Sequence, residues 1–155
     1  MNASAAAAHD SDLPAHILAR TPYAAHLGIL REQDGFLLPY RERLLGDASR
    51  PALHGGVVAG FMETAALLHL LLNDIAATRL PKTIDFSIDY LRSAGPRATH
   101  AACEVQRVGR RVALVSVRCW QEDTQKPVAL ARAHFLWEAR DQGEGAAAGQ
   151  HGQQG

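Results

Sequence analysis

The sequence carries no excess of either charge. Its 155 residues include 16 Lys or Arg and 16 Asp or Glu, so the formal net charge is zero. The basic residues are not gathered into the stripe that marks a nucleic-acid-binding face. We therefore expect no nucleic-acid partner, and any attraction to an anionic ligand must come from a few local side chains.

Cysteine is also scarce, and Cys103 and Cys119 fall in different expected strands. A hairpin that turns at Gly109-Arg110 would place position 103 opposite about 116 and Cys119 opposite about 100, so the two thiols do not face each other. Neither has a metal-type partner at short spacing. We expect two reduced thiols, no metal, no cofactor and a cytoplasmic location.

Signals for export or for a membrane are missing as well. The segment Met1–Ser11 has no basic start and no apolar run of leucines, so no signal peptide is expected. The apolar run Val57–Leu72 is too short for a membrane span and contains Glu63 and His69. A nucleophile elbow with Ser-His-Asp order and a phosphate-binding loop are also not found.

The length and composition fit one globular domain. Hydrophobic residues make up 47% of the chain, which is ordinary for a folded protein. Composition predicts a flexible segment over 1–12, the folded domain over 13–138, and a disordered tail rich in Gly, Gln and Ala over 139–155.

The rest of the chain is organised around the run Val57–Leu72, which is apolar almost all the way round. A helix of that kind must be buried on all sides. Glu63 lies in its middle, and a buried carboxylate without partners costs several kcal/mol or has its pKa raised until it is neutral. Gly55 and Gly56 precede the run and would let a ligand approach the unpaired N–H groups of the first turn. This end could bind an oxyanion.

Period-two alternation and turn signals predict the other elements. A short helix is expected within Leu13–Ala25, followed by a turn at Thr21-Pro22, and a loop over Leu44–Ala52. The long helix should run from about Gly56 to Thr78. The expected strands are Leu27–Gln33 and Phe36–Glu42 around the turn Asp34-Gly35, then Ile84–Tyr90, Ala98–Arg107, Val112–Gln121 and Val128–Trp137.

This order predicts an α+β domain in which one antiparallel sheet of about five to six strands wraps around one long central helix. The alternate residues Ala129, Ala131 and Ala133 are small enough to let that helix pack close. Since one sheet face cannot cover the helix completely, a second subunit is a natural way to bury the rest.

Several motifs together resemble the hotdog-fold acyl-CoA thioesterases of the PaaI-like and 4-hydroxybenzoyl-CoA thioesterase group. The matching segments are Leu53-His54-Gly55-Gly56 with the acid Glu63, Ile84-Asp85-Phe86-Ser87-Ile88-Asp89-Tyr90-Leu91-Arg92, Gly109-Arg110-Arg111-Val112-Ala113 and Ala131-Arg132-Ala133-His134-Phe135. They span roughly Ala24 to Trp137. The resemblance implies hydrolysis of an acyl-CoA, medium-chain or aromatic, in a site shared by two chains of a homodimer or homotetramer.

By position in that family, the Gly55 N–H would bind the thioester oxygen. Glu63 of the facing subunit would be the nucleophile or the general base. The further residues that the resemblance implies are His54, Asp47 and Thr64 near the reacting group, and Gly56, Arg92, Gly109, Arg110 and Arg111 for the substrate and its CoA phosphates.

Two positions depart from the family pattern. Where many relatives have Asn or Gln to orient water, Asp47 is the candidate here, and an ionised acid cannot donate as an amide does. The hydroxyl that some relatives place one turn after the acid is Leu67, so Thr64 either substitutes for it or packs. Asp47 could equally be an ordinary turn residue.

Other interpretations stay open. Glu63 could be satisfied by a neighbouring backbone group, and His54 could hold the loop by hydrogen bonds rather than transfer protons. The alternative function is a non-catalytic acyl-CoA binding or sensing module on the same fold. A hydratase would need a different motif with paired His and acid, which the sequence does not contain.

Overall fold

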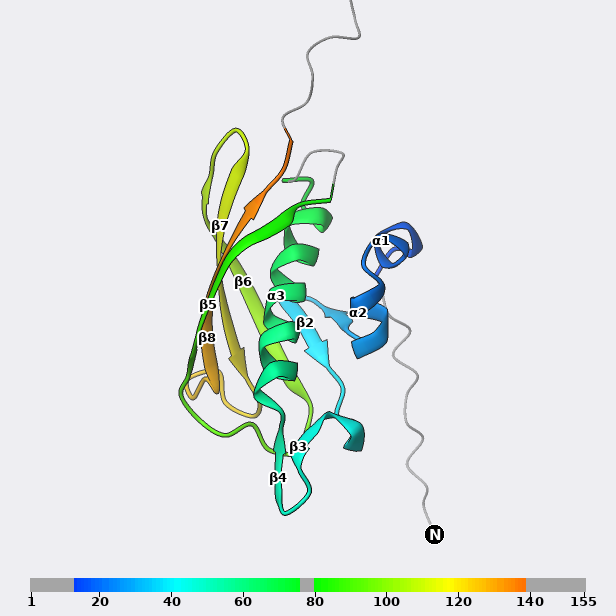
Figure 1. The fold of residues 1–155 in the computed structure, drawn as a ribbon, viewed down its shortest axis with the longest axis vertical. Helices are drawn as coiled ribbons and strands as arrows, with labels where there is room; N and C mark the ends of the chain where they lie inside the picture. Colours follow the sequence, from blue (N-terminus) through cyan, green and yellow to red (C-terminus); the bar gives the residue numbers. More distant parts are fainter. Residues whose placement is uncertain (1–12, 76–79, 139–155) are drawn as a thin grey trace, which may run out of the picture.

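The computed structural model describes residues 13–75 and 80–138. They form a six-stranded antiparallel sheet in the order β1-β2-β6-β7-β8-β5, and the long helix α3 (Gly55–Leu72) packs along one face of it (Figure 1). The strands are β1 (Leu30–Glu32), β2 (Gly35–Leu38), β5 (Lys82–Tyr90), β6 (Thr99–Val108), β7 (Val112–Trp120) and β8 (Ala129–Leu136). The α+β architecture is therefore as predicted. The segments 1–12 and 139–155, for which we predicted disorder, lie outside the described residues.

The inward-facing residues of β8, three alanines and a phenylalanine, form the surface against which α3 packs. Ala129, Ala131, Ala133 and Phe135 are buried, whereas the side chains between them are more exposed. Their alanine methyls leave room for the helix to approach β6, β7 and β8 closely. The close packing that the sequence predicted for this strand is confirmed.

The N-terminal part contains two helices, α1 (Ala15–Arg20) and α2 (Pro22–Leu27), where one helix and a turn were predicted. The break falls at Thr21, whose hydroxyl donates to the Ile17 carbonyl at 2.7 Å, and Pro22 then starts α2 because proline suits a first helical position. Both helices pack against α3, on its side away from β5–β8 (Figure 1). The predicted hairpin is present, but its turn is Gln33-Asp34 rather than Asp34-Gly35, since Gly35 pairs with Glu32, and β1 and β2 are shorter than expected.

The segment predicted as a loop before α3 is largely ordered into a small hairpin. A short 3₁₀ helix, Glu42–Leu44, leads into β3 (Leu45–Asp47) and β4 (Arg50–Leu53), which pair with each other. The turn closes because the Asp47 carboxylate accepts hydrogen bonds from the backbone N–H and the hydroxyl of Ser49, both at 2.8 Å.

Helix α3 ends at Leu72, so the prediction that it continues to Thr78 is wrong. Asn73 caps it: the Asn73 amide donates to the His69 carbonyl at 2.8 Å, and Asp74 takes a left-handed conformation with φ of 52°. Such a residue after the last turn stops a helix. Apolar residues alone gave no sign of this stop.

The register of the β6–β7 hairpin differs from the prediction because its turn is centred on Arg110-Arg111, with Val108 opposite Ala113. A bulge between Val105 and Arg107 then reduces the difference to one residue at the cysteines. Cys103 is opposite Val117, and Cys119 is opposite Ala101. Both thiols are free, as predicted.

Strand β5 is the edge of the sheet, and its inner face is only partly covered. Phe86 and Ile88 are half-buried as predicted, but Ile84 and Tyr90 are 56% and 54% exposed. Ile84 lies at an irregularity between Thr83 and Asp85, which turns it out of the alternation. For these two residues the prediction of a half-buried strand is wrong in a single chain.

Candidate functional site at the start of helix α3

His54 and Gly55 build the N-terminal end of α3. The His54 ring caps the helix by accepting the Gly56 N–H on Nδ1 at 2.9 Å, and the His54 carbonyl accepts the N–H groups of Val57 and Val58. Within the described chain the Gly55 N–H has no hydrogen-bond acceptor. One backbone donor at the positive end of α3 is thus left for an oxygen from outside the helix.

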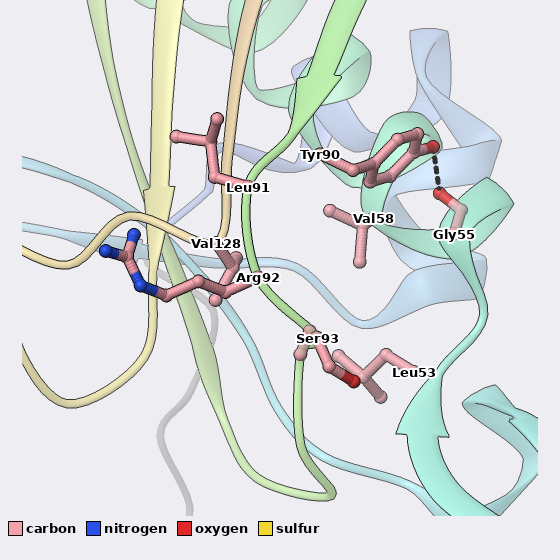
Figure 2. Close-up of a pocket in the computed structure, with 9 residues that line it drawn as sticks. Leu53, Gly55, Val58, Tyr90, Leu91, Arg92, Ser93 and Val128 are labelled. Atoms are coloured by element: carbon pink, nitrogen blue, oxygen red, sulfur yellow. Dashed lines mark hydrogen bonds between the residues drawn. The ribbon is translucent and has the colours of Figure 1, made fainter.

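A cavity of about 390 Å³ opens beside this end. Gly55 and Val58 form its helix side, and Tyr90 to Ser93, at and after the end of β5, form the opposite side (Figure 2). The Tyr90 hydroxyl crosses between them and donates to the Gly55 carbonyl at 2.7 Å. This hydrogen bond fixes the end of β5 against the first turn of α3.

Arg92 lines the same cavity and is anchored at its rim. Its guanidinium donates to the Pro127 carbonyl at 2.8 Å and projects away from α3 in Figure 2. One hydrogen bond leaves most of its donors unused, so the group could bind an anionic part of a ligand that enters the cavity. Of the predicted site residues, the structure therefore places Gly55 and Arg92 in the lining of one cavity, and His54 and Gly56 are the chain neighbours of Gly55.

Glu63 lies two turns further along α3, on a stripe that the rest of the chain leaves partly open. Gly56, Gly60, Glu63 and Leu67 all fall on this stripe, so in one chain α3 is not buried on all sides as its composition predicted. No described residue forms a hydrogen bond or an ion pair with the Glu63 carboxylate. Eight residues of helical rise separate Glu63 from Gly55 by about 12 Å, so the two groups of one chain do not converge on one carbonyl.

Tyr23 of α2 flanks the same stripe. A Cβ atom at Gly60 would lie 2.8 Å from the Tyr23 hydroxyl, so the glycine is what allows the phenol to rest on α3. Thr64 points elsewhere: it is buried, and its hydroxyl donates to the Gly60 carbonyl at 2.6 Å. The Thr64 hydroxyl is therefore engaged within its own helix.

The Asp47 carboxylate is held in its turn by Ser49. The backbone N–H of Ser49, and then its hydroxyl, lower the pKa of Asp47, which keeps this exposed acid ionised. Gly46, next to it, packs against His54, since a Cβ at Gly46 would lie 3.1 Å from the His54 Cα. The turn thus borders the start of α3, although the Asp47 oxygens already accept two hydrogen bonds.

The basic hairpin between β6 and β7 is at the opposite end of the sheet. Gly109, Arg110 and Arg111 line a separate cavity of about 370 Å³ together with Arg107 and His134. The pairing of Tyr90 with Ala129, and of Val112 with Leu136, places Tyr90 and this hairpin at opposite ends of β8. Within one chain, the structure does not bring these arginines to Arg92.

Other ionisable groups of α3 and the sheet are less suited to chemistry. Burial lowers the pKa of His69 and raises the pKa of Cys103 and of Cys119 to about 12, so the imidazole and both thiols are held neutral. Among residues 13–75 and 80–138 no three His, Cys, Asp or Glu side chains gather in a way that could hold a metal ion.

Tyr90 is the residue of this site to which sequence reasoning gave no role. Its signal was present, since it continues the alternation of Phe86 and Ile88 on the inner face of β5. What the sequence could not show is that the end of β5 lies beside Gly55, 35 residues away in the chain.

Comparison with known proteins identifies the family of this chain. The model of the thioesterase superfamily matches residues 51–128, about half of the chain, from β4 to the start of β8. A medium/long-chain acyl-CoA thioesterase of Salmonella typhimurium, YigI, is 30% identical over 105 residues, which are 60% of this chain and 67% of that protein.

Solved structures show the same fold. A protein from Chromobacterium violaceum has 43% sequence identity and a TM-score of 0.61, with 80% of this chain and 88% of that chain covered. The E. coli PaaI protein from the phenylacetic acid degradation operon has 20% identity and a TM-score of 0.64, covering 79% and 94%. At 20% identity the second likeness shows the fold alone.

Proposed function

Since this chain belongs to the thioesterase superfamily and has its hotdog fold, we propose that it hydrolyses an acyl-CoA thioester with a medium-chain or aromatic acyl group. The products are a free carboxylic acid and CoA. The observation that carries the proposal is the Glu63 carboxylate, which lies partly open in the middle of an apolar helix without a partner among the described residues.

Two chains supply the two halves of the site. Gly55 offers an unused N–H at the start of α3, and Glu63 of the same chain is about 12 Å further along the helix axis. A carbonyl held by Gly55 of one subunit can therefore be attacked with the help of Glu63 from its partner. The open stripe of α3 and the exposed inner face of β5 support this homo-oligomer, which would be at least a dimer.

The chemistry follows from the positions of these groups. Attack on the thioester carbon moves an electron pair onto the carbonyl oxygen, and a fixed N–H at a helix end stabilises that charge most in the transition state. Glu63 either adds to the carbon itself or takes a proton from the attacking water. The C–S bond then breaks, and the CoA thiolate leaves and is protonated. In the general-base route the free acid is formed in this step, whereas in the nucleophilic route water must next hydrolyse the mixed anhydride between the acyl group and Glu63, which releases the acid and restores the carboxylate.

The other proposed residues bind or orient the substrate. His54 fixes the loop by capping α3, and Arg92 at the cavity rim would bind a phosphate of CoA. Arg110 and Arg111 of the same chain lie at the other end of the sheet. They can contact CoA in this cavity only if a dimer or tetramer places the hairpin of another chain beside it. The free thiols fit a cytoplasmic enzyme.

The experiment is a thiol-release assay over straight-chain and aromatic acyl-CoAs with the wild type and Glu63→Gln. The variant should lose at least about two orders of magnitude in turnover, because the amide is neither a base nor a nucleophile, and should still bind CoA. Glu104→Gln, an acid-to-amide change at an exposed position of β6, is the matched control and should leave the rate unchanged.

Equal rates for wild type and Glu63→Gln would remove Glu63 from the mechanism. If acyl-CoA binds but no substrate of the panel releases thiol in the wild type, the protein is instead a non-catalytic acyl-CoA binding module.

A further inference from the structure

A separate cavity of about 610 Å³ lies between the two N-terminal helices and the β1–β2 hairpin. Its apolar wall consists mainly of Leu18, Ala25, Ile29, Leu30 and Leu37. None of its lining residues lines the cavity beside Gly55. Its size and apolar wall are those of sites for small organic ligands, which usually add a few polar groups that fix the ligand's orientation.

Arg41 supplies such a group. Gly28, in the left-handed conformation that ends α2, also lines the cavity, and the Arg41 guanidinium lies directly over it. A Cβ at Gly28 would lie 2.8 Å from the Arg41 Cζ, so any other residue there would displace the guanidinium. Glycine at position 28 thus both permits the turn and makes room for the charge.

The guanidinium is held over Gly28 and is open to solvent. The C-terminal carbonyls of α2 favour a cation at this end of the helix, which accounts for where Arg41 lies. However, no described residue forms an ion pair or a hydrogen bond with the Arg41 side chain. A planar fork of donors at the edge of an apolar cavity matches a carboxylate joined to an apolar body.

We propose that this cavity binds a medium-chain carboxylic acid in its ionised form. The carboxylate would accept hydrogen bonds from Arg41 at the Gly28 end, and the hydrocarbon chain would lie along Leu18, Leu30 and Leu37. Only the choice of a medium-chain acid rests on the proposed function, since that acid is the class of product expected from thioester hydrolysis. The site itself lies away from Glu63 and Gly55 and does not depend on that function.

The test is a titration of the full-length, ¹⁵N-labelled protein with octanoate, which reports both affinity and place. The amide signals of Gly28, Leu37 and Arg41 should shift together. Arg41→Gln should weaken binding at least about tenfold, because a charge-assisted hydrogen bond is lost. Octanamide, which has the same chain without the charge, should bind the wild type correspondingly more weakly.

Arg43→Gln is the matched control. Arg43 is two residues away and donates to the His26 carbonyl at 3.3 Å but does not line the cavity, so its removal should leave the affinity unchanged. Because Arg41 is exposed, Arg41→Gln keeps the core intact, and the spectrum itself verifies the fold.

Three results would overturn the proposal: no binding of octanoate, the same affinity in Arg41→Gln as in the wild type, or shifts confined to Gly55, Tyr90 and Arg92. The last would mean that the acid binds beside Gly55 only. Failure of the thioesterase assay leaves this test unaffected, because the titration needs no turnover.

Discussion

Strands β5 and β8 are neighbours with the same alternating pattern, but the burial of their inner faces differs. The inner face of β8 is covered by its own chain, whereas that of β5 is only partly covered. The two strands pair from Lys82 with Leu136 to Tyr90 with Ala129. The inner residues of β8 lie under α3 and are buried, whereas Tyr90 at the end of β5 is more than half exposed. An alternating pattern therefore predicts which residues are apolar enough to be buried, but it does not tell whether their own chain or another chain buries them.

The difference suggests the surface that a second copy would cover in the proposed homo-oligomer. As the last strand of the sheet, β5 also presents backbone groups that no described strand pairs. Exposed edges that carry apolar side chains are usually covered by another chain. The partly open stripe of α3 around Glu63 also leaves apolar surface of the helix exposed, which another chain could bury. In the proposed homo-oligomer, both would belong to one interface, in which Glu63 of one subunit would face Gly55 of its partner.

The largest expected effect is that of a charge on the inner face of β5. Ile88 is half-buried against its own core. Ile88→Asp should abolish the proposed dimer and lower thiol release at least about a hundredfold, because a carboxylate on this face costs several kcal/mol, and circular dichroism checks that the variant still folds. Light scattering and the thiol-release assay measure the two effects. Ser87→Asp puts the same charge on the outer face of the same strand and should keep both properties. A dimer that survives Ile88→Asp would place the interface elsewhere.

The matching change on β8 should act on stability rather than assembly. Ala133 is fully buried under α3, so Ala133→Leu overpacks the core and should lower the free energy of unfolding by about 1–3 kcal/mol in urea titrations. Arg132→Leu, on the outer face beside it, should change stability by no more than about 0.5 kcal/mol. Equal effects of the two substitutions would mean that the inner face of β8 is no more buried than its outer face.

The covered part of the sheet also predicts a pH dependence. Cys119 lies opposite Ala129, and burial raises its pKa from 9.0 to about 12. Between these values the unfolded chain loses the thiol proton while the folded chain keeps it, so stability falls as pH rises above 9. Its contribution to this loss should be about 1 kcal/mol between pH 8 and pH 10.

Urea unfolding of wild type and Cys119→Ala at both pH values isolates this contribution. Stability of the variant should fall less with pH. Identical pH slopes for the two proteins would show that the thiol is not desolvated as the fold implies.

The smallest effect is expected at the end of β5. Tyr90→Phe removes only the hydrogen bond to the Gly55 carbonyl, and neutral hydrogen bonds contribute about 1 kcal/mol. Turnover should fall about two- to fivefold in the thiol-release assay, and the melting temperature should fall by only a few degrees in calorimetry. Tyr40→Phe, at a tyrosine remote from this site, is the control. A hundredfold loss would instead mean that the Tyr90 hydroxyl touches the reacting group.

Sequence alone predicted most of this fold because its signals are local. Alternation located the strands after α3, and Asp34-Gly35 located the first hairpin. The errors fall where a hydrogen bond from a side chain sets the backbone conformation. The bond between Ser49 and Asp47 closes a hairpin where a loop was expected, and the Asn73 side chain caps α3 earlier than predicted. No periodicity reports such hydrogen bonds.

The candidate site was predictable in part for the same reason. An acid in an apolar helix, and glycines before that helix, can be recognised in a linear sequence, so Glu63 and Gly55 could be named as candidates. Tyr90 and the separation of Arg92 from Arg110 depend on which strand ends meet, and only the register of β5, β7 and β8 determines that.

The most direct test of a shared site is to mix two inactive variants. Glu63→Gln removes the acid, and Gly55→Pro removes the N–H at a first helical position where proline is well accepted. If Glu63 of one chain works with Gly55 of the other, a mixed dimer keeps one intact site. Random mixing of equal amounts should then restore about a quarter of the wild-type rate, as expected for a two-fold symmetric dimer. A mixture that has formed mixed dimers and yet releases no more thiol than the two variants measured separately would contradict the account.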